Sequence, residues 1–381
     1  MFIKYFLILL SWVFNLIKYI KSEILNWGKG FTFPGYILEF TKIDFLKIYF
    51  QKVDSTYIFV TGTNGKTSTC SLLKHLLVSQ GFSVVSNHTG SNLRRGVLST
   101  LILEFSEILK VKPDYLVLEL DEASVPSVLK SFPKHKSFYL MVLNLSRDQL
   151  DRYGEIDNLV VGINNVLTEF PHCNLILGED LYTEKFRKPY SLLKKHRHKK
   201  ELIKSLGIKE YTHLNQNLDF ILTLFELLHI PISSDSVGVF NLVEGRGTTY
   251  KINNTSFEIH LTKNPVSFNN NLKFLQKRTV SNVLIYVNDN IPDGRDVSWF
   301  YDIDYSLLKT VLGNKSVFLC GSRSYDFYNF LNILNIPSFN MLNMSKVMKY
   351  CKLWNLPSLF VFSNYSATQE VLNRFKQMEY R

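Results

Sequence analysis

A short run of glycine, lysine and hydroxyl side chains has the composition of a loop that binds phosphate groups. It lies between an apolar stretch of strand length and a helical pattern, and it reads Thr61-Gly62-Thr63-Asn64-Gly65-Lys66-Thr67-Ser68. Glycines let the backbone turn so that amide groups and the helix N-terminus converge on a phosphate. Lys66 would contact the β- and γ-phosphates, and the Thr67 hydroxyl is suited to ligate Mg²⁺. Because the spacing is a compressed form of the G-x-x-x-x-G-K-[ST] loop, the run predicts nucleotide phosphate binding.

Acidic side chains at the end of a second apolar stretch, residues 115–120, are candidates for holding a metal ion. Mg²⁺ prefers oxygen ligands, and open α/β sheets bind ligands at the carboxyl ends of their strands. Strand alternation predicts Glu119 and Asp121 on one face and Glu122 on the opposite face. Asp121 and Glu122 are also suited to capping the next helix, whereas Glu119, inside the apolar run, calls for a compensating cation.

The elements that must position these residues are short apolar runs separated by helical stretches. The predicted strands of the first part cover residues 57–61, 82–86, 115–120, 138–144 and 174–177, with helices at 66–79 and 215–228. A second alternation has strands near 257–261, 283–287, 316–320 and 359–362. Strands that alternate with helices imply crossover connections and a mostly parallel sheet. We therefore predict an α/β fold with an apolar N-terminal helix in 1–33, a central nucleotide-binding domain in 34–237 and a smaller Rossmann-like α/β domain in 238–381.

The composition is that of a globular protein with a basic charge balance. The 381 residues are 46% hydrophobic and 20% charged, which excludes a disordered or collagen-like chain. Forty-four lysines and arginines against 33 acidic residues give a net charge of +11, which favours an anionic partner. The four cysteines form no C-x-x-C pair, which argues against a disulfide framework and fits a reducing cytosol.

The first twenty residues are strongly apolar and contain two widely spaced lysines. Only thirteen residues separate Lys4 from Lys18, and a helix of that length rises about 20 Å, less than a hydrocarbon core of about 30 Å. No signal-peptide cleavage site follows. The segment is therefore a helix lying in the membrane interface, a helix buried against the body or a short spanning anchor. The lysines, with Trp12 and Trp27, favour the interface.

Nine lysines and arginines crowd into residues 184–204 against two glutamates, which accounts for 9 − 2 = +7 of the net charge. The simplest interpretation is a solvated helix or loop. The alternative is a patch that meets anionic lipid headgroups or a polyanionic substrate. Nucleic-acid binding is not predicted, because no aromatic RNA-binding motif or DNA-reading helix accompanies the run.

Several motifs together resemble the Mur ligase superfamily, whose members use ATP to join amines to carboxylates through an acyl-phosphate. The phosphate loop, the acidic strand end and N-L-S-R-D-Q-L-D-R-Y-G-E at 144–155 are of this kind. Within the superfamily the chain resembles the MurT family of ligase subunits, which act with a GatD-type glutaminase as a lipid II isoglutaminyl synthase. The resemblance spans residues 34–370, and its most specific string is N-D-N-I-P-D-G-R-D-V-S-W at 288–299.

The resemblance implies roles for individual residues in the ligase reaction. Lys66 and Thr67 would hold the ATP phosphates and Mg²⁺, with Glu119 as the metal carboxylate. In the superfamily an asparagine lies beside the adenine and an arginine reaches the phosphates, and the matching positions are Asn215 and Arg246. The substrate would be met by the matching segments that contain Asn92, Lys263 and Asn264.

The resemblance also implies an aspartate that serves the partner. In the MurT family the C-terminal domain lends an aspartate to the Cys-His pair of the glutaminase, where it fixes the histidine tautomer. The matching position is Asp296, with Asp293 as the second choice, although Pro-Asp-Gly at 292–294 is also a turn signature.

Three departures from Mur ligases refine this interpretation. Gln149 stands where ordinary Mur ligases have a histidine, and Asn164 occupies the approximate place of their carbamylated lysine. MurT-like proteins share the glutamine, which favours that family. The zinc ribbon that is common in the family is replaced by the basic segment after Asp180, so zinc is not expected. Among the histidines, His88 is a candidate substrate contact and His75 a structural residue.

Together these features predict ATP-dependent amidation of the D-glutamate α-carboxyl of the lipid II stem peptide to D-isoglutamine. ATP and Mg²⁺ would be the cofactors. Ammonia would come from a GatD-like glutaminase that forms a heterodimer with the chain, because no Cys-His pair here resembles a glutaminase nucleophile. The expected location is the cytoplasm, at the inner face of the membrane. The alternatives are another Mur-like amino acid or peptide ligase, or a non-catalytic nucleotide-binding scaffold for the glutaminase.

Overall fold

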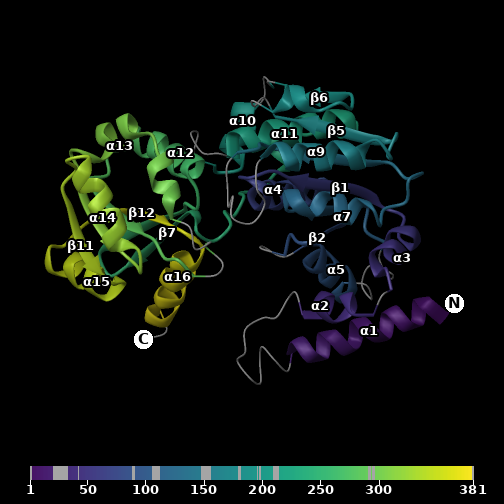
Figure 1. Ribbon diagram of the computed structural model, residues 1–381, viewed down its shortest axis with the longest axis horizontal. Coiled ribbons are helices and arrows are strands. Elements are labelled where there is room, and N and C mark those ends of the chain that lie inside the picture. Colours follow the sequence, from purple (N-terminus) through teal and green to yellow (C-terminus); the bar gives the residue numbers. More distant parts are fainter. Residues whose placement is uncertain are drawn as a thin grey trace. The chain divides into compact units, whose positions relative to one another are not determined.

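The computed structural model contains two compact units, which are described separately (Figure 1). It describes residues 2–19, 33–41, 43–87, 91–104, 112–146, 156–178, 182–194, 196, 199–208, 214–290, 293 and 297–379. The main part of the first unit ends at Phe240, and that of the second begins at Asn241. The sequence-based boundary was placed between residues 237 and 238.

The first unit is built on a six-stranded sheet of order β2-β3-β1-β4-β5-β6 in which every neighbouring pair is parallel. The strands are β1 (Thr56–Thr61), β2 (Val84–Ser86), β3 (Tyr115–Glu119), β4 (Phe138–Val142), β5 (Cys173–Leu177) and β6 (Tyr190–Leu192). The α-helices are α1 (Phe2–Tyr19), α2 (Phe33–Glu39), α3 (Phe45–Lys52), α4 (Lys66–Ser79), α5 (Arg94–Leu103), α7 (Val125–Leu129), α9 (Ile156–Leu167), α10 (Lys199–Ser205) and α11 (Leu214–Leu227). Short 3₁₀ turns are η2 (Glu122–Ser124), η3 (Thr183–Lys185) and η4 (Ser234–Ser236).

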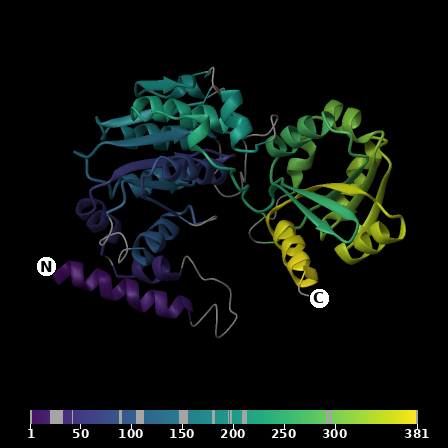
Figure 2. The same cartoon turned by 180° about the vertical axis from the view of Figure 1, so that it is seen from behind.

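Both faces of this sheet are covered, because the side chains of its central strand alternate between two apolar layers. Tyr57 and Phe59 join a core cluster with residues of α7 and α9, while α4 packs against β1 and β3 and α11 against β5 (Figures 1 and 2). Phe132 lies at the centre of an aromatic cluster, with ring centroids 5.0–6.3 Å from those of Phe50, Tyr57, Phe59, Phe138 and Phe170. This packing fixes β1, whose carboxyl end carries the phosphate loop.

The second unit has its own six-stranded sheet, of order β11-β10-β9-β12-β8-β7. The strands are β7 (Arg246–Ile252), β8 (Thr255–Leu261), β9 (Asn282–Tyr286), β10 (Ser316–Cys320), β11 (Ser338–Leu342) and β12 (Ser358–Ser363). The helices are α12 (Pro265–Gln276), α13 (Tyr305–Leu312), α14 (Ser324–Ile333), α15 (Met344–Leu353) and α16 (Tyr365–Glu379), with the 3₁₀ turn η6 (Ser298–Asp302). Only the β7–β8 pair is antiparallel, so the predicted α/β fold with mostly parallel sheets is confirmed.

Three strands were not predicted from the sequence, and all three lie at sheet edges. β6, β7 and β11 are each hydrogen-bonded to one neighbour only, and their residues are mostly half-buried or exposed. An edge strand does not need an apolar run, because one side of it meets solvent. The apolar pattern that predicts buried strands is therefore weak at these positions.

Helix α1 combines a face that packs on the first unit with a face that remains exposed. Phe14 is buried, and Ser11 and Asn15 donate hydrogen bonds to the Leu103 carbonyl at the end of α5, at 3.1 and 3.0 Å. Among residues 8–17 of α1, the exposed side chains are those of Asn15 and of four large apolar residues, Leu9, Trp12, Val13 and Leu16. Among the described residues, no helix has both the length and the apolar character that crossing a membrane requires.

Candidate functional site

The predicted phosphate loop lies between β1 and α4, and two glycines give it its shape. Gly62 and Gly65 have φ angles of +128° and +91°, which L-residues with side chains rarely adopt. A Cβ atom at Gly62 would also lie 2.8 Å from the Asn144 carbonyl oxygen. Glycine is therefore required at Gly62 both by its conformation and by the close approach of the chain after β4.

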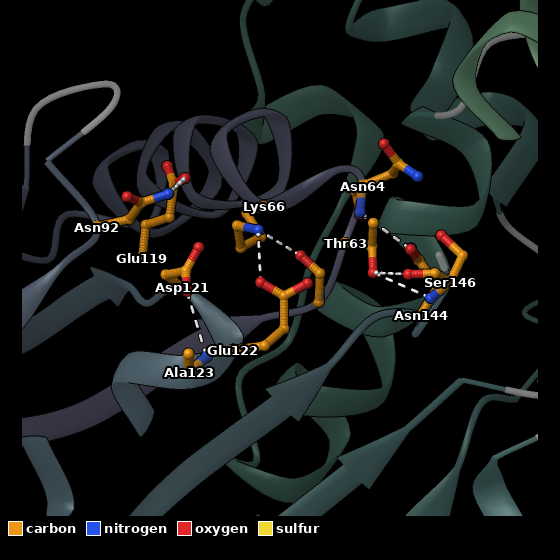
Figure 3. Close-up of polar contacts among 11 residues, drawn as sticks. Thr63, Asn64, Lys66, Asn92, Glu119, Asp121, Glu122, Ala123, Asn144 and Ser146 are labelled. Atoms are coloured by element: carbon orange, nitrogen blue, oxygen red, sulfur yellow. Dashed lines mark hydrogen bonds and ion pairs between the residues drawn. The ribbon is translucent and has the colours of Figure 1, made fainter. Parts of the chain in front are cut away.

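Asn144, which sequence analysis did not single out, holds the loop in place (Figure 3). Its carbonyl accepts from the Thr63 amide and its side-chain oxygen from the Asn64 amide, both at 2.9 Å. Its side-chain nitrogen donates to the Asn64 carbonyl at 2.8 Å, and the Thr63 hydroxyl accepts from the Ser146 amide at 3.0 Å. Hydrogen bonds within the chain therefore fix the shape of the loop.

The N-terminus of α4 has the character of an anion site. Gly65 occupies the N-cap position, and no side chain caps the helix. The first-turn amides of a helix have no intrahelical acceptor, and the helix dipole makes this end favourable for negative charge. These features fit a nucleotide phosphate.

Lys66 points back across the loop and is held by two acceptors. Its ammonium donates to the Gly62 carbonyl at 2.5 Å and to Glu122 Oε2 at 3.0 Å (Figure 3). Both partners of this ion pair are buried. An ammonium has three N–H donors, so one remains for a ligand after these two contacts.

The charge state of Lys66 follows from its surroundings. Burial alone would lower the pKa of the Lys66 ammonium, but the nearby carboxylates of Glu122, Glu119 and Asp121 raise it above the ordinary lysine value. Lys66 is therefore charged at neutral pH, as a phosphate-binding lysine must be.

The prediction that Glu122 faces away from Glu119 and Asp121 was wrong. The alternation of β3 ends at Glu119, and the chain then turns into η2, so Glu122 reaches Lys66. Asp121 is the N-cap of η2 and accepts from the Ala123 amide at 3.2 Å. The extended geometry assumed for residues 119–122 does not continue past the strand, which explains the error.

Glu119 is buried at the carboxyl end of β3, with Asn92 as a hydrogen-bond partner. Asn92 Nδ2 donates to Glu119 Oε1 at 3.2 Å, so the two predicted site residues lie side by side (Figure 3). Asn87 fixes the backbone of Glu119 by accepting from its amide at 2.8 Å and donating to its carbonyl at 2.9 Å. Together with the Thr67 hydroxyl, Glu119 provides hard oxygen ligands of the kind that Mg²⁺ prefers.

Helix α11 brings a further asparagine to the loop. Asn217 is buried, and its side chain lies where a Cβ atom at Gly65 would come within 3.0 Å of it. Asn215, the residue predicted to lie beside the adenine, is half-buried and lies two residues earlier on the same helix. The adenine contact of Asn215 stays a prediction, and Asn217 is a loop neighbour that the sequence did not indicate.

Three of the predicted site residues lie at or just before the start of a secondary-structure element of the second unit. Arg246 is the first residue of β7. Asn264 is the N-cap of α12, where its side chain accepts from the Ser267 amide at 2.9 Å in a capping box. Lys263 precedes this cap, and its amide donates to the Ser267 hydroxyl at 3.1 Å. The substrate roles of Lys263 and Asn264 stay predictions, and the Asn264 side chain has a structural role in any case.

Of the two candidate aspartates for the partner glutaminase, the structure describes Asp293. Asp296 lies outside the described residues, as does Gln149. Asp293 is buried, and both of its carboxylate oxygens accept hydrogen bonds from Ser366. Burial raises the pKa of Asp293, and the hydrogen bonds from Ser366 oppose that effect.

Asn164, which replaces the lysine of ordinary Mur ligases, is buried and serves the basic segment. Its side chain donates to the Lys185 carbonyl at 2.8 Å and accepts from the Arg187 amide at 3.1 Å. Several cations of the segment pair within the unit, including Lys185 with Asp157 at 2.5 Å and Lys194 with Glu226 at 2.8 Å. The segment comprises η3, β6 and α10 rather than a single helix or loop.

The histidines predicted to be of interest are only partly described. His88 lies outside the described residues. His75 Nε2 lies 3.0 Å from the Gly238 carbonyl oxygen, and its ring packs against Phe240. These contacts fit the structural role that was predicted for His75.

Two family models match successive parts of the chain. The Mur ligase middle domain matches residues 60–243, and the MurT ligase C-terminal domain matches residues 261–368.

Relatives and solved structures agree with these matches. The lipid II isoglutaminyl synthase (glutamine-hydrolyzing) subunit MurT of Staphylococcus aureus (strain COL) is 26% identical over 347 residues, covering 74% of this chain and 78% of the relative. The MurT subunit of Streptococcus pneumoniae (strain ATCC BAA-255 / R6) is 31% identical over 155 residues, covering 40% and 33%. The crystal structure of MurF ligase from Thermotoga maritima in complex with ADP has a TM-score of 0.64 at 15% identity, covering 88% of this chain and 83% of that one.

The phosphate loop and the matching domains define an ATP-dependent ligase of the Mur ligase type. Within that class the chain is MurT-like, because the MurT C-terminal domain follows the Mur ligase middle domain and the S. aureus subunit matches over most of both chains. The resemblance predicted from the sequence is thereby confirmed.

Replacing Glu122 by glutamine tests the buried ion pair. Loss of the charge leaves the buried Lys66 ammonium without its direct counter-ion, although Glu119 and Asp121 remain nearby. We expect the free energy of unfolding to fall by about 3 kcal/mol, the lower end for breaking a buried pair. Denaturant unfolding measures it. The matched control is Glu226→Gln, which breaks the exposed pair with Lys194 and should cost about 1 kcal/mol or less. Equal effects of the two changes would contradict a buried pair.

Replacing Lys66 by alanine tests the phosphate contact. A charge-assisted hydrogen bond is worth about 1.5–3 kcal/mol, so ATP affinity should fall about 10- to 100-fold in calorimetric titration. Lys74, exposed on the same helix α4, is the control, and Lys74→Ala should bind ATP as the unchanged chain does. If Lys66→Ala binds ATP with unaltered affinity, Lys66 does not contact the nucleotide.

Proposed function

We propose that the chain is the ligase subunit of a lipid II isoglutaminyl synthase that amidates the D-glutamate α-carboxyl of the lipid II stem peptide. The observation that carries the proposal is a MurT-type C-terminal domain on the same chain as an ordered phosphate loop with a charged, buried Lys66. The S. aureus relative, whose name states this activity, supports it over most of its length.

The reaction that fits this site has two steps. The γ-phosphoryl group of ATP passes to a carboxylate oxygen, which gives an acyl-phosphate and ADP. Ammonia then forms a bond to the acyl carbon as phosphate leaves, and the loss of a proton gives the amide of D-isoglutamine. Phosphorylation turns a carboxylate oxygen, which is a poor leaving group, into part of a phosphate, which is a good one. This activation of the carboxylate is what ATP contributes to the reaction.

The residues of the loop have distinct parts in this scheme. The α4 N-terminus and the third N–H of Lys66 bind the β- and γ-phosphates and balance the charge that develops on the transferred group. Thr67 and Glu119 would hold Mg²⁺, which neutralises phosphate charge when bound. Glu122 and the Gly62 carbonyl hold Lys66 in position, and Asn144 fixes the shape of the loop.

Ammonia must come from outside the chain, and a GatD-like glutaminase in a heterodimer is the proposed source. A glutaminase needs a reactive thiolate, whereas all four cysteines here are buried. Burial raises the pKa of Cys173 and Cys320 to about 12 and that of Cys351 to about 11, and it also raises that of Cys70. Such thiols are protonated at neutral pH and are poor nucleophiles.

The buried contacts of Asn164 favour this function over an amino-acid-adding Mur ligase. Those enzymes place a carbamylated lysine at about this position, whereas the Asn164 side chain is committed to the backbone of the basic segment.

We propose that the enzyme works at the cytoplasmic face of the membrane, where a lipid-linked substrate resides. Leu9, Trp12, Val13 and Leu16 lie at i, i+3, i+4 and i+7 of α1 and are all exposed, so they form one apolar stripe. In the sequence, Lys4 and Lys18 flank the four residues of the stripe, and lysines are suited to anionic headgroups. Peripheral attachment through this stripe would hold the enzyme near lipid II.

The amidation itself is tested with the full chain co-purified with the glutaminase from its own genome. With ATP, Mg²⁺ and glutamine, lipid II should gain one amide, read by mass spectrometry as a loss of about 1 Da, and Lys66→Ala should abolish this while the complex stays assembled. Unmodified lipid II from the active complex would refute the function.

The role of Asp296 is tested by comparing nitrogen sources. Asp296→Asn should abolish amidation driven by glutamine, because the partner's histidine loses its oriented carboxylate, and should spare amidation driven by added ammonia. Equal loss of both activities would exclude Asp296 from the partner's triad.

Membrane attachment is tested by changing the stripe on α1. Burying one leucine side chain is worth about 1.5–3 kcal/mol, so the double change Leu9→Asn and Leu16→Asn should lower partition onto phosphatidylglycerol-containing vesicles at least about tenfold. The matched control is Leu342→Asn with Leu353→Asn, two exposed leucines of the second unit. Partition is measured by vesicle co-sedimentation, and equal partition of the two double variants would exclude the stripe.

A further inference from the structure

The carboxyl ends of β9 and β12 carry two chain segments that are joined by hydrogen bonds between the Asn364 side chain and the Asn288 backbone. The Asn288 amide donates to Asn364 Oδ1 at 3.2 Å, and Asn364 Nδ2 donates to the Asn288 carbonyl at 2.6 Å. Both asparagines are buried. The segment that follows β9, with the string N-D-N-I-P-D-G-R-D, is therefore attached at its first residue to the segment that leads into α16.

Asp293 makes a second attachment, five residues further along. Its Oδ1 accepts from the Ser366 amide at 2.9 Å, and its Oδ2 accepts from the Ser366 hydroxyl at 2.5 Å. Ser366 is the second residue of α16, whose first-turn amides have no intrahelical acceptors. Asp293 thus performs the work of an N-cap for a helix that begins 72 residues later in the sequence.

The Ser366 hydroxyl connects the two attachments. It accepts from Asn288 Nδ2 at 3.2 Å and from Asn290 Nδ2 at 2.9 Å while it donates to Asp293. Asn288 Nδ2 also donates to Glu370 Oε1, one turn further along α16, at 3.0 Å. Residues 288, 290 and 293 are therefore all held on the first turns of one helix.

We propose that Asp293 is a positioning residue that anchors the chain after β9 to the N-terminus of α16, and that it is not the aspartate presented to the glutaminase. The inference rests on the proposed function and assigns the two aspartates of that segment to different tasks. A triad aspartate must offer an oxygen to the partner's histidine. Asp293 is 8% exposed, and both of its oxygens accept from Ser366, so its carboxylate is turned toward α16 and is covered by the chain itself.

The anchor and the triad roles predict opposite results for a conservative change. Asparagine caps helices about as well as aspartate, so Asp293→Asn should keep the glutamine-driven rate of the complex within about threefold. Asp293→Ala removes the acceptor, and the displaced segment should lower the ratio of glutamine-driven to ammonia-driven amidation by about tenfold or more. In a triad, by contrast, an aspartate-to-asparagine change costs about 10⁴-fold.

Asp304→Ala is the matched control for the loss of a cap. Asp304 caps α13 in the same unit by accepting from the Leu307 amide at 2.9 Å. This change should lower the melting temperature as Asp293→Ala does, by about 2–4 °C, but leave the ratio of the two amidation rates unchanged. If the ratio of the two amidation rates falls equally in both variants, Asp293 contributes only to the general stability of the chain and is not an anchor.

The results separate the anchor from the proposed function. If Asp293→Asn abolishes only glutamine-driven amidation, Asp293 is the triad residue and the anchor is refuted while the ligase function stands. If the unchanged complex amidates nothing, the function fails. The melting temperatures of the isolated chain then still test the contact between Asp293 and Ser366. If Asp293 is an anchor, the melting temperature of Asp293→Ala must be lower than that of Asp293→Asn. If the contact is absent, the two melting temperatures must be equal.

Discussion

A buried ammonium surrounded by carboxylates is the constraint on which the first unit depends. Burying the charge of Lys66 is costly unless an opposite charge lies next to it, and Glu122 meets that requirement at 3.0 Å. The two residues belong to segments that follow β1 and β3, so their contact needs neighbouring parallel strands that end at the same edge. The crossover helices, the aromatic cluster behind β1 and the glycines of the loop all serve to bring these two strand ends together.

The same arrangement leaves the site with an excess of negative charge. One lysine among Glu119, Asp121 and Glu122 gives 1 − 3 = −2 before any ligand binds. A nucleotide triphosphate alone would add to that charge, whereas its magnesium complex would offset part of it. In the proposed function, the carboxylates would favour binding of the nucleotide together with its metal ion over binding of the free nucleotide.

Local signals in the sequence predicted much of the first unit, and contacts between distant segments set the limit. The loop and the bounds of α4 were found because glycines, a lysine and a helical pattern follow one another along the chain. Asn144 begins the string quoted at 144–155 but was given no role, and Asn217 was not indicated at all, because an asparagine's contact with a distant loop is visible only in the folded chain. Glu122 was placed on the wrong face because alternation was extended beyond the end of β3.

In the second unit the sequence could not distinguish the roles of residues of the same chemical type. Asp293 and Asp296 are the same residue type in one short string, so the sequence could rank them only by resemblance. The contact of Asp293 with Ser366 joins residues 73 positions apart and is visible only in the folded chain. Asn264 was also open to two interpretations. Its position before Pro265 is a local signature of a helix cap, whereas the resemblance indicated a substrate contact.

The placement of the tryptophans has a consequence for spectroscopy. The four tryptophans are Trp12, Trp27, Trp299 and Trp354, so the expected nucleotide-binding domain at 34–237 has none. Trp12 is 66% exposed on the apolar stripe of α1, while Trp299 packs against Phe300 in the second unit. A single tryptophan introduced beside Asn217 would therefore be the one tryptophan of that domain, and its emission would report on the neighbourhood of the phosphate loop.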